Sequence, residues 1–295
     1  MKSEFNKIAI IGPGLIGSSL GLALKKKKIA KTILGIDKSQ SNLKDALNNK
    51  SIDISSKIID KNLNGSEVIF ICTPVSKIEK IANKVIPFVN KKTILTDVGS
   101  VKNIFSKLTL QKINSACKLV PGHPIAGTEF SGAKNAFHNL FQNKWCILTP
   151  QDKNISEVKI VSNIWKLIGM KVSTMSADEH DKLMSVTSHL PHLIAFTIVG
   201  TAFNISEKKK KDLLNFSAGG FKDFTRIGSS DPQMWSDIFL KNKKHLLKTL
   251  NDFNQDLETL KKFIQKMDEK SIIKLLKKTK EIRKQILKVE KNFDR

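Results

Sequence analysis

The sequence predicts an α/β domain followed by an all-helical domain. A short apolar strand at 7–11 runs through a glycine-rich turn into a helix, and further apolar strands alternate with helical segments up to about residue 175. From Ser176 onward no segment has the pattern of a strand, and apolar residues recur at helical spacing. Strands that alternate with helices are typical of a parallel sheet covered by helices. A chain of 295 residues has enough material for two domains, each with its own core.

The first strand and helix are joined by a turn of the form GxGxxG. Gly12 permits the tight turn, Gly14 lets the backbone approach a pyrophosphate, and Gly17 lets the helix pack closely on the strand. The next strand ends at Asp37, where a carboxylate can accept hydrogen bonds from ribose hydroxyls and repels a 2′-phosphate. The sequence therefore predicts a Rossmann-type domain that binds NAD in preference to NADP. An ordinary βα turn is the alternative.

The expected cofactor site extends to the carboxyl ends of two later strands. The strand at 67–71 is followed by the turn Thr73–Pro74, and the strand at 93–97 leads into a polar loop at 98–102. In a doubly wound sheet these ends face the cofactor. Further strands are expected at 118–120, 145–149 and 171–175, with helices at 39–47 and 155–168. The predicted cofactor-binding residues are Gly12, Gly14, Leu15, Ile16, Gly17, Asp37, Thr73 and Pro74.

The helical domain is expected to begin near Met175, which gives domains at 1–175 and 176–295. Residues 183–203 have helical spacing, interrupted by Pro191. A heptad pattern then suits packing along another long helix, and its positions are Leu246, Leu250, Phe253, Leu257, Leu260, Ile264 and Met267. A last amphipathic helix follows. The pattern favours a homodimer formed through the C-terminal helices; burial of the heptad seam within one subunit is the alternative.

Composition narrows the possible classes of protein. The formal net charge is +24, but the lysines are spread along the chain, only three of the 51 basic residues are arginine, and no basic stripe alternates with aromatic residues. A nucleic-acid-binding function is therefore not expected. No unbroken run of about 18 apolar residues occurs, so no membrane span is expected, and the first strand begins too early for a signal peptide. Three scattered cysteines indicate reduced thiols in the cytoplasm.

Four polar clusters stand out against this background. They are Gly99–Ser100, 122–124 around His123, 188–192 with His189 and His192, and 221–226 with Arg226. His189 and His192 lie one helical turn apart, but no third ligand follows at a suitable spacing, so no metal site is expected. A guanidinium binds a carboxylate through two parallel hydrogen bonds, which a lysine cannot do.

These clusters occur in the same order as in the prephenate/arogenate dehydrogenase family of tyrosine biosynthesis. The sequence resembles this family, most of all its bacterial prephenate dehydrogenases. The matching segments are GPGLIGSS (12–19), DVGSVK (97–102), GHPIAGTE (122–129), SHLPH (188–192) and GGFKDFTRIGSSDPQMW (219–235). The resemblance implies an NAD-dependent oxidative decarboxylation, in which prephenate gives 4-hydroxyphenylpyruvate and CO2. Arogenate is the alternative substrate, because the matched segments concern the ring that both compounds share. A β-hydroxyacid dehydrogenase is a more distant alternative.

The resemblance also implies roles for individual residues. His123 is the expected base for the ring hydroxyl, and Ser100 is expected to bind that hydroxyl and to orient His123. A histidine with an ordinary pKa can accept a proton at neutral pH. The expected substrate-binding residues are Arg226, His192, Glu129, Asp223 and Trp235, of which Asp223 supports the arginine and Trp235 reaches the neighbouring subunit's site. Simpler roles remain open: a turn residue for His123, a helix cap for Asp223 and a core residue for Trp235. His138, His180 and His245 are expected to be surface or packing residues.

Overall fold

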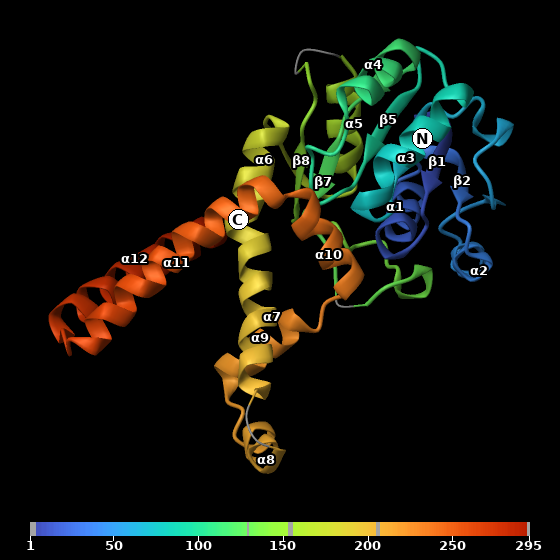
Figure 1. Cartoon of the computed structure of the whole chain (residues 1–295). Helices are drawn as coiled ribbons and strands as arrows, with labels where there is room; N and C mark the ends of the chain where they lie inside the picture. The colour runs from blue at the N-terminus through green and yellow to red at the C-terminus, as the bar shows by residue number, and fades with distance from the viewer. Residues whose placement is uncertain (1–3, 129, 153–155, 205–206, 294–295) are drawn as a thin grey trace. The chain divides into compact units, whose positions relative to one another are not determined.

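The computed structural model describes residues 4–128, 130–152, 156–204 and 207–293. Its main sheet has six parallel strands in the order β3-β2-β1-β4-β5-β6 (Figure 1). This is the strand order of a Rossmann-type dinucleotide-binding fold, with the topological switch point between β1 and β4. The strands are β1 (Phe5–Ile11), β2 (Ala30–Ile36), β3 (Ile54–Ser56), β4 (Val68–Ile71), β5 (Ile94–Asp97) and β6 (Lys118–Leu119).

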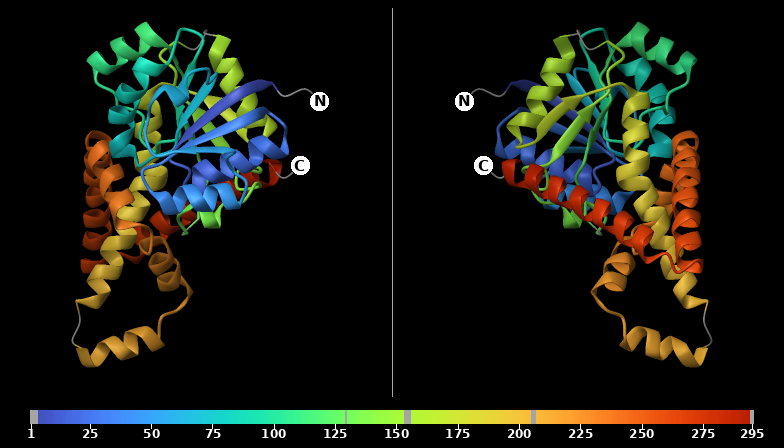
Figure 2. Two further views of the ribbon diagram at one scale, coloured as in Figure 1. Left: turned by 90° about the vertical axis from the view of Figure 1, so that its right-hand side faces the viewer. Right: turned by 90° about the vertical axis from the view of Figure 1, so that its left-hand side faces the viewer.

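Alternate residues of the central strands enter two separate cores, one on each face of the sheet. In β1, Ile8 and Ile10 belong to one core, and Ala9 and Ile11 belong to the other. Because both faces are covered, these strands are apolar throughout. The first core includes side chains from α1 (Leu15–Lys26), α2 (Gln40–Asn48) and α5 (Ser156–Leu167), and the second includes side chains from α3 (Val75–Val85) and α4 (Lys107–Ala116). Figure 2 shows these helices on either side of the sheet.

A second, three-stranded sheet adjoins the first. It consists of β7 (Gly122–Pro124), β8 (Trp145–Leu148) and β9 (Lys171–Thr174), with β7 antiparallel to β8 and β8 parallel to β9. Strands β3 and β7 are not among the strands expected from the sequence. Each has only three residues, and the prolines on either side of His123 make the sequence of β7 look like a turn. Short irregular helices occur at η1 (Lys61–Leu63), η2 (Ile86–Phe88) and η3 (Ala133–Asn135).

The helical part of the chain begins with α6 (Ala177–Met184), which the side chain of Ser176 caps in a reciprocal capping box with Glu179. A π-helical turn, η4 (Ser185–His189), joins α6 to α7 (Leu190–Phe203) without a break. The expectation that Pro191 interrupts this helix is therefore wrong. The proline lies in the first turn of α7, where a missing N–H is tolerated.

The continuous helix from Ala177 to Phe203 also has the length and apolar composition that a membrane span requires, and 28% of its most apolar window is buried. The expectation of no membrane span rested on unbroken apolar runs, and in this helix polar residues such as His189 and His192 interrupt the run. A helix that packs against other helices meets the same criterion. Beyond α7 follow α8 (Glu207–Asn215), α9 (Gly219–Gly228) and α10 (Pro232–Lys241); α9 packs on α7, and α10 packs on α3.

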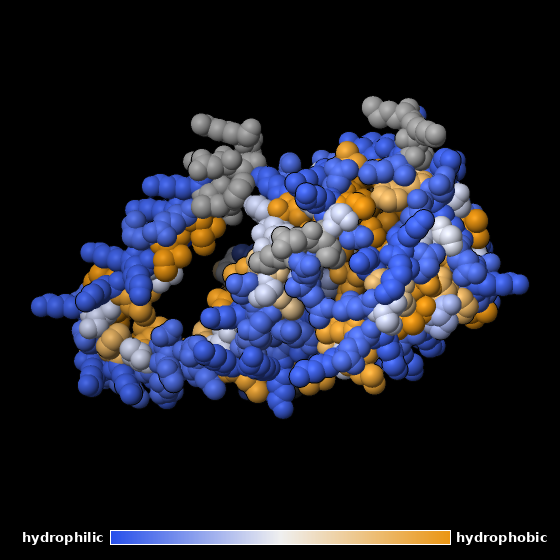
Figure 3. Space-filling model, turned by 90° about the horizontal axis from the view of Figure 1, so that it is seen from above, coloured by the Kyte–Doolittle hydropathy of each residue, from blue (hydrophilic) through white to orange (hydrophobic). Residues whose placement is uncertain are grey.

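The chain separates into two compact units between Leu246 and Leu247, within α11 (Lys243–Gln265). The second unit holds the rest of α11 and all of α12 (Glu269–Phe293). Met267, the last position of the expected heptad, lies in the turn between the two helices with a positive φ of 52°, so the seam ends earlier than predicted. Hydrophobic side chains are exposed along this unit, which is seen at the left in Figure 3. They include Leu257, Ile264, Ile273, Leu276, Ile282 and Ile286.

Candidate active site

The glycine-rich turn has the geometry that its sequence predicts. Gly12 has a φ of +89°, and a side chain there would lie 2.8 Å from the carbonyl oxygen of Cys72. A Cβ on Gly17 would lie 2.4 Å from the carbonyl oxygen of Gly12. Both glycines are therefore required by the packing of α1 on β1 and β4. At Gly14, by contrast, a Cβ would have no neighbour within 4 Å, so the N-terminus of α1 is open on this side.

This open helix end fits a pyrophosphate. The first N–H groups of a helix, here at Leu15 and Ile16, have no partner within the helix, and no acidic residue lies in the first turn of α1. The hydroxyl of Thr73, at the end of β4, is buried without a hydrogen-bond partner. Pro74, beside it, occupies the N-cap position of α3 and makes no side-chain capping hydrogen bond. These groups are the donors and the space that a bound dinucleotide requires.

Asp37 lies directly after β2, half-buried, as a ribose-binding carboxylate would. One carboxylate oxygen accepts the backbone N–H of Ser39 at 2.8 Å, and the other accepts the side-chain amide of Asn42 at 3.2 Å. These bonds orient the carboxylate, and each oxygen keeps a further lone pair for a hydroxyl. The residues around the turn therefore fit a dinucleotide.

His123 lies in β7, at the carboxyl end of β5, and is 9% exposed. Its Nδ1 is 2.8 Å from Nε2 of His180, and Nδ1 of His180 is 2.8 Å from Oδ1 of Asp181. Burial lowers the pKa of His123 well below its ordinary value, and the neighbouring basic groups of His180, Lys102 and His189 lower it further. At neutral pH the imidazole is therefore uncharged and able to accept a proton.

Ser100 does not orient His123 in this structure. In the described part of the chain no hydrogen bond joins the two residues, and Nδ1 of His123 is bonded to His180 instead. Ser100 lies half-buried in the loop after β5. In the same loop, Lys102 forms a buried ion pair with Asp97 and donates a hydrogen bond to the carbonyl of Gly122, the residue before His123. The ammonium group therefore connects the end of β5 to β7.

His192 and Trp235 come together on the helical side of the site. Their rings stack with centroids 3.7 Å apart, and Nδ1 of His192 donates to the carbonyl of Ser188 at 2.9 Å. Burial lowers the pKa of His192. Trp235 lies buried inside its own chain, in the core that also holds side chains of α3, which differs from the expectation that it reaches a neighbouring subunit. His189 is buried beside the pair, and its Nδ1 is 3.0 Å from the amide nitrogen of Asn242.

The remaining predicted residues are not assembled with His123. Arg226 and Asp223 form an exposed pair on α9, with Nη2 of the arginine 3.6 Å from Oδ1 of the aspartate. No ion pair or hydrogen bond within the described residues joins Arg226 to His123 or His192. In Figures 1 and 2, α9 packs beside α7, near the end of α7 that is farther from the sheet. Glu129 lies outside the described residues.

Sequence reasoning missed three groups at this site: His180, Asp181 and Lys102. His180 was expected on the surface or in plain packing, yet it is fully buried and bonded to His123. The available signal was the sequence Ser176 to Glu179, which has the form of a capping box and predicts a helix that carries His180 and Asp181. Nothing local could show that this helix faces β7, because the two histidines are 57 residues apart in the chain.

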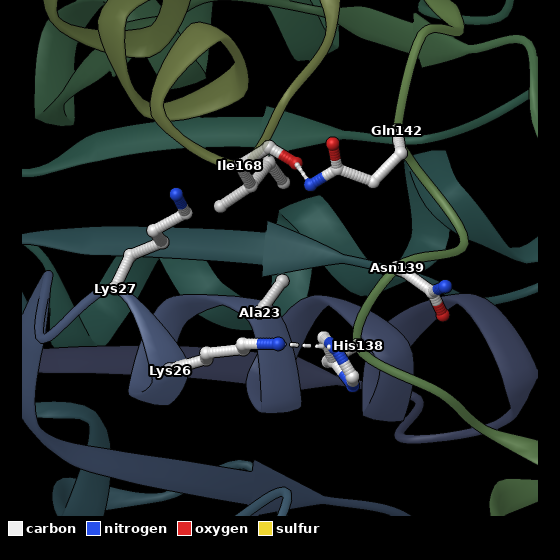
Figure 4. Close-up of a pocket in the computed structure, with 7 residues that line it drawn as sticks. All are labelled: Ala23, Lys26, Lys27, His138, Asn139, Gln142 and Ile168. Carbon is white, nitrogen blue, oxygen red and sulfur yellow. Dashed lines mark hydrogen bonds between the residues drawn. The ribbon is translucent and has the colours of Figure 1, made fainter.

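A surface cavity of about 320 Å³ lies away from these residues, at the C-terminal end of α1 (Figure 4). Its lining residues are Ala23, Lys26, Lys27, His138, Asn139, Gln142 and Ile168. The close-up shows Lys26 directed at His138, and Gln142 donating to the carbonyl of Ile168. None of the predicted site residues lines this cavity, and exposed lysines alone do not define a ligand. The convergence of buried polar groups at His123 marks the better candidate for chemistry.

Comparison with known proteins places this geometry in a family. Two sequence profiles match the chain: "Prephenate dehydrogenase, nucleotide-binding domain" over residues 20–174, and "Prephenate dehydrogenase, dimerization domain" over residues 176–278. The cyclohexadienyl dehydrogenase of Zymomonas mobilis is 35% identical over 283 residues, which cover 95% of each chain.

Solved structures agree with the sequence comparison. The prephenate dehydrogenase of Aquifex aeolicus, in complex with hydroxyphenyl propionate and NAD+, superposes with a TM-score of 0.87 and 36% identity, covering 96% of this chain and 98% of that one. The arogenate dehydrogenase of Synechocystis gives a TM-score of 0.80 and 28% identity, covering 95% and 99%. With its two expected domains matched in order and its glycine turn and buried histidine in place, the chain belongs to the prephenate dehydrogenase family.

Proposed function

We propose that this protein is an NAD-dependent prephenate dehydrogenase, which converts prephenate to 4-hydroxyphenylpyruvate and CO2. The observation that carries the proposal is the buried, uncharged imidazole of His123 at the carboxyl edge of a Rossmann-type sheet. The Aquifex aeolicus relative binds NAD+ and hydroxyphenyl propionate, and hydroxyphenyl propionate carries the ring and the carboxylate side chain expected of such a product. NAD, when bound, supplies the acceptor for the hydride that leaves the substrate ring.

The chain's own residues supply the proton transfer. Nδ1 of His123 is engaged by His180, so Nε2 is the nitrogen left to take the proton of the ring hydroxyl. As that oxygen becomes a carbonyl, the hydride leaves the same carbon. The ring carboxylate then departs as CO2, and the electrons of the broken C–C bond make the ring aromatic and convert the carbonyl to a phenolate oxygen, which takes the proton back. Ser100, half-buried in the neighbouring loop, is proposed to hydrogen-bond the hydroxyl.

Arg226 is proposed to bind a substrate carboxylate, with Asp223 as its partner, His192 and Trp235 bordering the same pocket, and Glu129 gating it. The support is chemical: Arg226 is the only arginine before α12, and a guanidinium pairs with a carboxylate through two hydrogen bonds. The cofactor is proposed to contact Gly12, Gly14, Leu15, Ile16, Gly17, Asp37, Thr73 and Pro74.

We further propose that two copies associate through their helical domains, 176–295. Supporting this are the match to the family's dimerization domain and the apolar side chains exposed along α11 and α12. Helix α7 is apolar around its whole circumference but only half-buried, as expected for a helix that a second subunit covers. A domain boundary near Met175 is supported by the two profiles, which meet between residues 174 and 176. Three free cysteines favour the cytoplasm.

The decisive experiment is a matrix of prephenate and arogenate against NAD and NADP, followed by NADH or NADPH absorbance. We expect the highest kcat/KM with prephenate and NAD, because the carboxylate of Asp37 repels a 2′-phosphate. Higher kcat/KM with arogenate would reassign the substrate within the same reaction. Absence of turnover with all four pairs, by a protein that still binds NAD, would refute the proposed function.

A further inference from the structure

A buried chain of hydrogen bonds leads from His123 to a carboxylate on another element. His123 in β7 contacts His180 in α6, and His180 contacts Asp181, with 2.8 Å between the paired atoms in each case. His180 is fully buried and Asp181 is 1% exposed. Neither residue was expected at the active site from the sequence.

The carboxylate at the end of this chain is held rigidly. Oδ1 of Asp181 also accepts the backbone N–H of Lys102, and Oδ2 accepts the backbone N–H of Asn103, both at 2.8 Å. Its backbone carbonyl accepts the side-chain amide of Asn242 at 2.7 Å. Burial alone would raise the pKa of Asp181, but the hydrogen bonds from His180, Asn103 and Lys102 outweigh burial and lower it. Asp181 is therefore ionised and can only accept hydrogen bonds.

The carboxylate of Asp181 determines the direction of both hydrogen bonds that link it to His180 and His123. Because Asp181 accepts, Nδ1 of His180 must carry a hydrogen. Burial lowers the pKa of His180, partly opposed by the hydrogen bond to Asp181, so the ring is neutral and its Nε2 has a lone pair. That lone pair can only accept a hydrogen from Nδ1 of His123. A neutral His123 with a hydrogen on Nδ1 has its own lone pair on Nε2.

We propose that His180 and Asp181 are positioning residues, which hold His123 in the tautomer with a hydrogen on Nδ1 and a lone pair on Nε2. The inference rests on the proposed function of His123 as the base. When Nε2 takes the proton of the substrate hydroxyl, the O–H bond breaks, the N–H bond forms, and no other proton has to move. The positive charge that arises on His123 is then stabilised through His180 by the carboxylate of Asp181.

The tautomer can be measured directly. In NAD-saturated protein labelled with 15N-histidine, we expect the Nε2 signal of His123 to be of the lone-pair type and the Nδ1 signal to be of the N–H type. Only six histidines are present, and the spectrum of His123→Asn identifies the signals of residue 123. A hydrogen on Nε2 of His123 in the wild-type protein would overturn the proposal, even if the protein is an active dehydrogenase. This measurement needs no turnover, so it is independent of the proposed function.

Two substitutions separate positioning from packing. In His180→Gln the amide oxygen takes the place of Nε2 and still accepts the hydrogen of His123, whereas His180→Phe fills the space without an acceptor. We expect His180→Phe to lower kcat roughly 10- to 100-fold with little change in the KM for NAD, and to mix the two tautomers of His123. His180→Gln should retain kcat within about threefold and keep the wild-type 15N pattern. Equal kcat in His180→Phe and the wild type, or equal losses in both variants with an unchanged tautomer, would overturn the proposal.

Discussion

At the scale of single residues, the site depends on which nitrogen of His123 is free. Nδ1 is engaged by His180 inside the protein, and Nε2 is the nitrogen that remains for the substrate. A histidine buried in this way is useful as a base only if its neutral form has the lone pair on the correct side. Burial keeps it neutral, and the charge of Lys102, which is buried close by in an ion pair with Asp97, acts in the same direction.

The substitution His123→Asn tests this assignment. The asparagine amide can replace Nδ1 and keep the hydrogen bond to His180, but nothing replaces Nε2. We expect kcat to fall roughly 10²- to 10⁴-fold, the usual contribution of a general base, while the affinity for NAD stays within about twofold. Initial rates and NAD titration by tryptophan fluorescence measure the two quantities. A similar loss in both would point to a structural role for His123.

At the scale of secondary-structure elements, the turn between β1 and α1 combines two different requirements for glycine. Gly17 is needed because a side chain would collide with the backbone of Gly12. Gly14 is not needed for packing, because the space beside it is open. If Gly14 is required, the reason must be the ligand that occupies this space.

Alanine substitutions at these two positions form a matched pair. Gly17→Ala should lower the thermal stability, by about 1–3 kcal/mol for overpacking, and weaken NAD binding as well. Gly14→Ala should leave the melting temperature nearly unchanged but reduce NAD affinity at least tenfold, because the new Cβ occupies space needed by the pyrophosphate. Differential scanning fluorimetry and calorimetric titration give both values. Normal NAD affinity in Gly14→Ala would show that the pyrophosphate binds elsewhere.

At the scale of the whole molecule, the exposed apolar residues of α11 and α12 require an explanation. Leu257 and Ile264 are 51% and 60% exposed in the single chain. In the proposed dimer they are covered, and replacing both by glutamate buries charge at the interface. We expect Leu257→Glu/Ile264→Glu to be monomeric at concentrations at which the wild type is dimeric, as measured by sedimentation equilibrium. The control Asn251→Glu/Gln255→Glu adds the same charge at polar positions and should remain dimeric. Dissociation of both variants would attribute the effect to charge alone.

The buried histidines also make the stability of the whole protein depend on pH. Burial lowers the pKa of His189 to about 4, and it lowers the pKa values of His123, His180 and His192 as well. Below pH 6.5 the unfolded chain therefore binds more protons than the native protein. The stability that these neutral histidines contribute is fully present above this pH and is lost as the pH falls. For His189 alone the loss by pH 4 is on the order of 3 kcal/mol.

Urea denaturation at pH 7.0 and pH 4.5, at one protein concentration, measures this loss. The variant His189→Gln has no group to titrate at this position and should lose less stability between the two pH values than the wild type does. Equal losses in the two proteins would show that His189 does not contribute. Asp181, whose pKa is also lowered, adds to the acid sensitivity of both proteins in the same direction.

Local sequence determined the fold class, the Rossmann-type turn and the order of the family's motifs, and it predicts a preference for NAD, because each depends on residues close together in the chain. The positions of Gly12, Gly17 and Asp37 are fixed by a single βαβ unit. Only the tertiary structure decided the partners of His123: strand β7 is too short to recognise, and His180 approaches from a helix 57 residues away. Ser100 lies closer in the sequence and was the expected partner, yet the packing of α6 presents His180 instead. A hydrogen-bond partner is chosen by distance in space, which the spacing of residues along a chain does not encode.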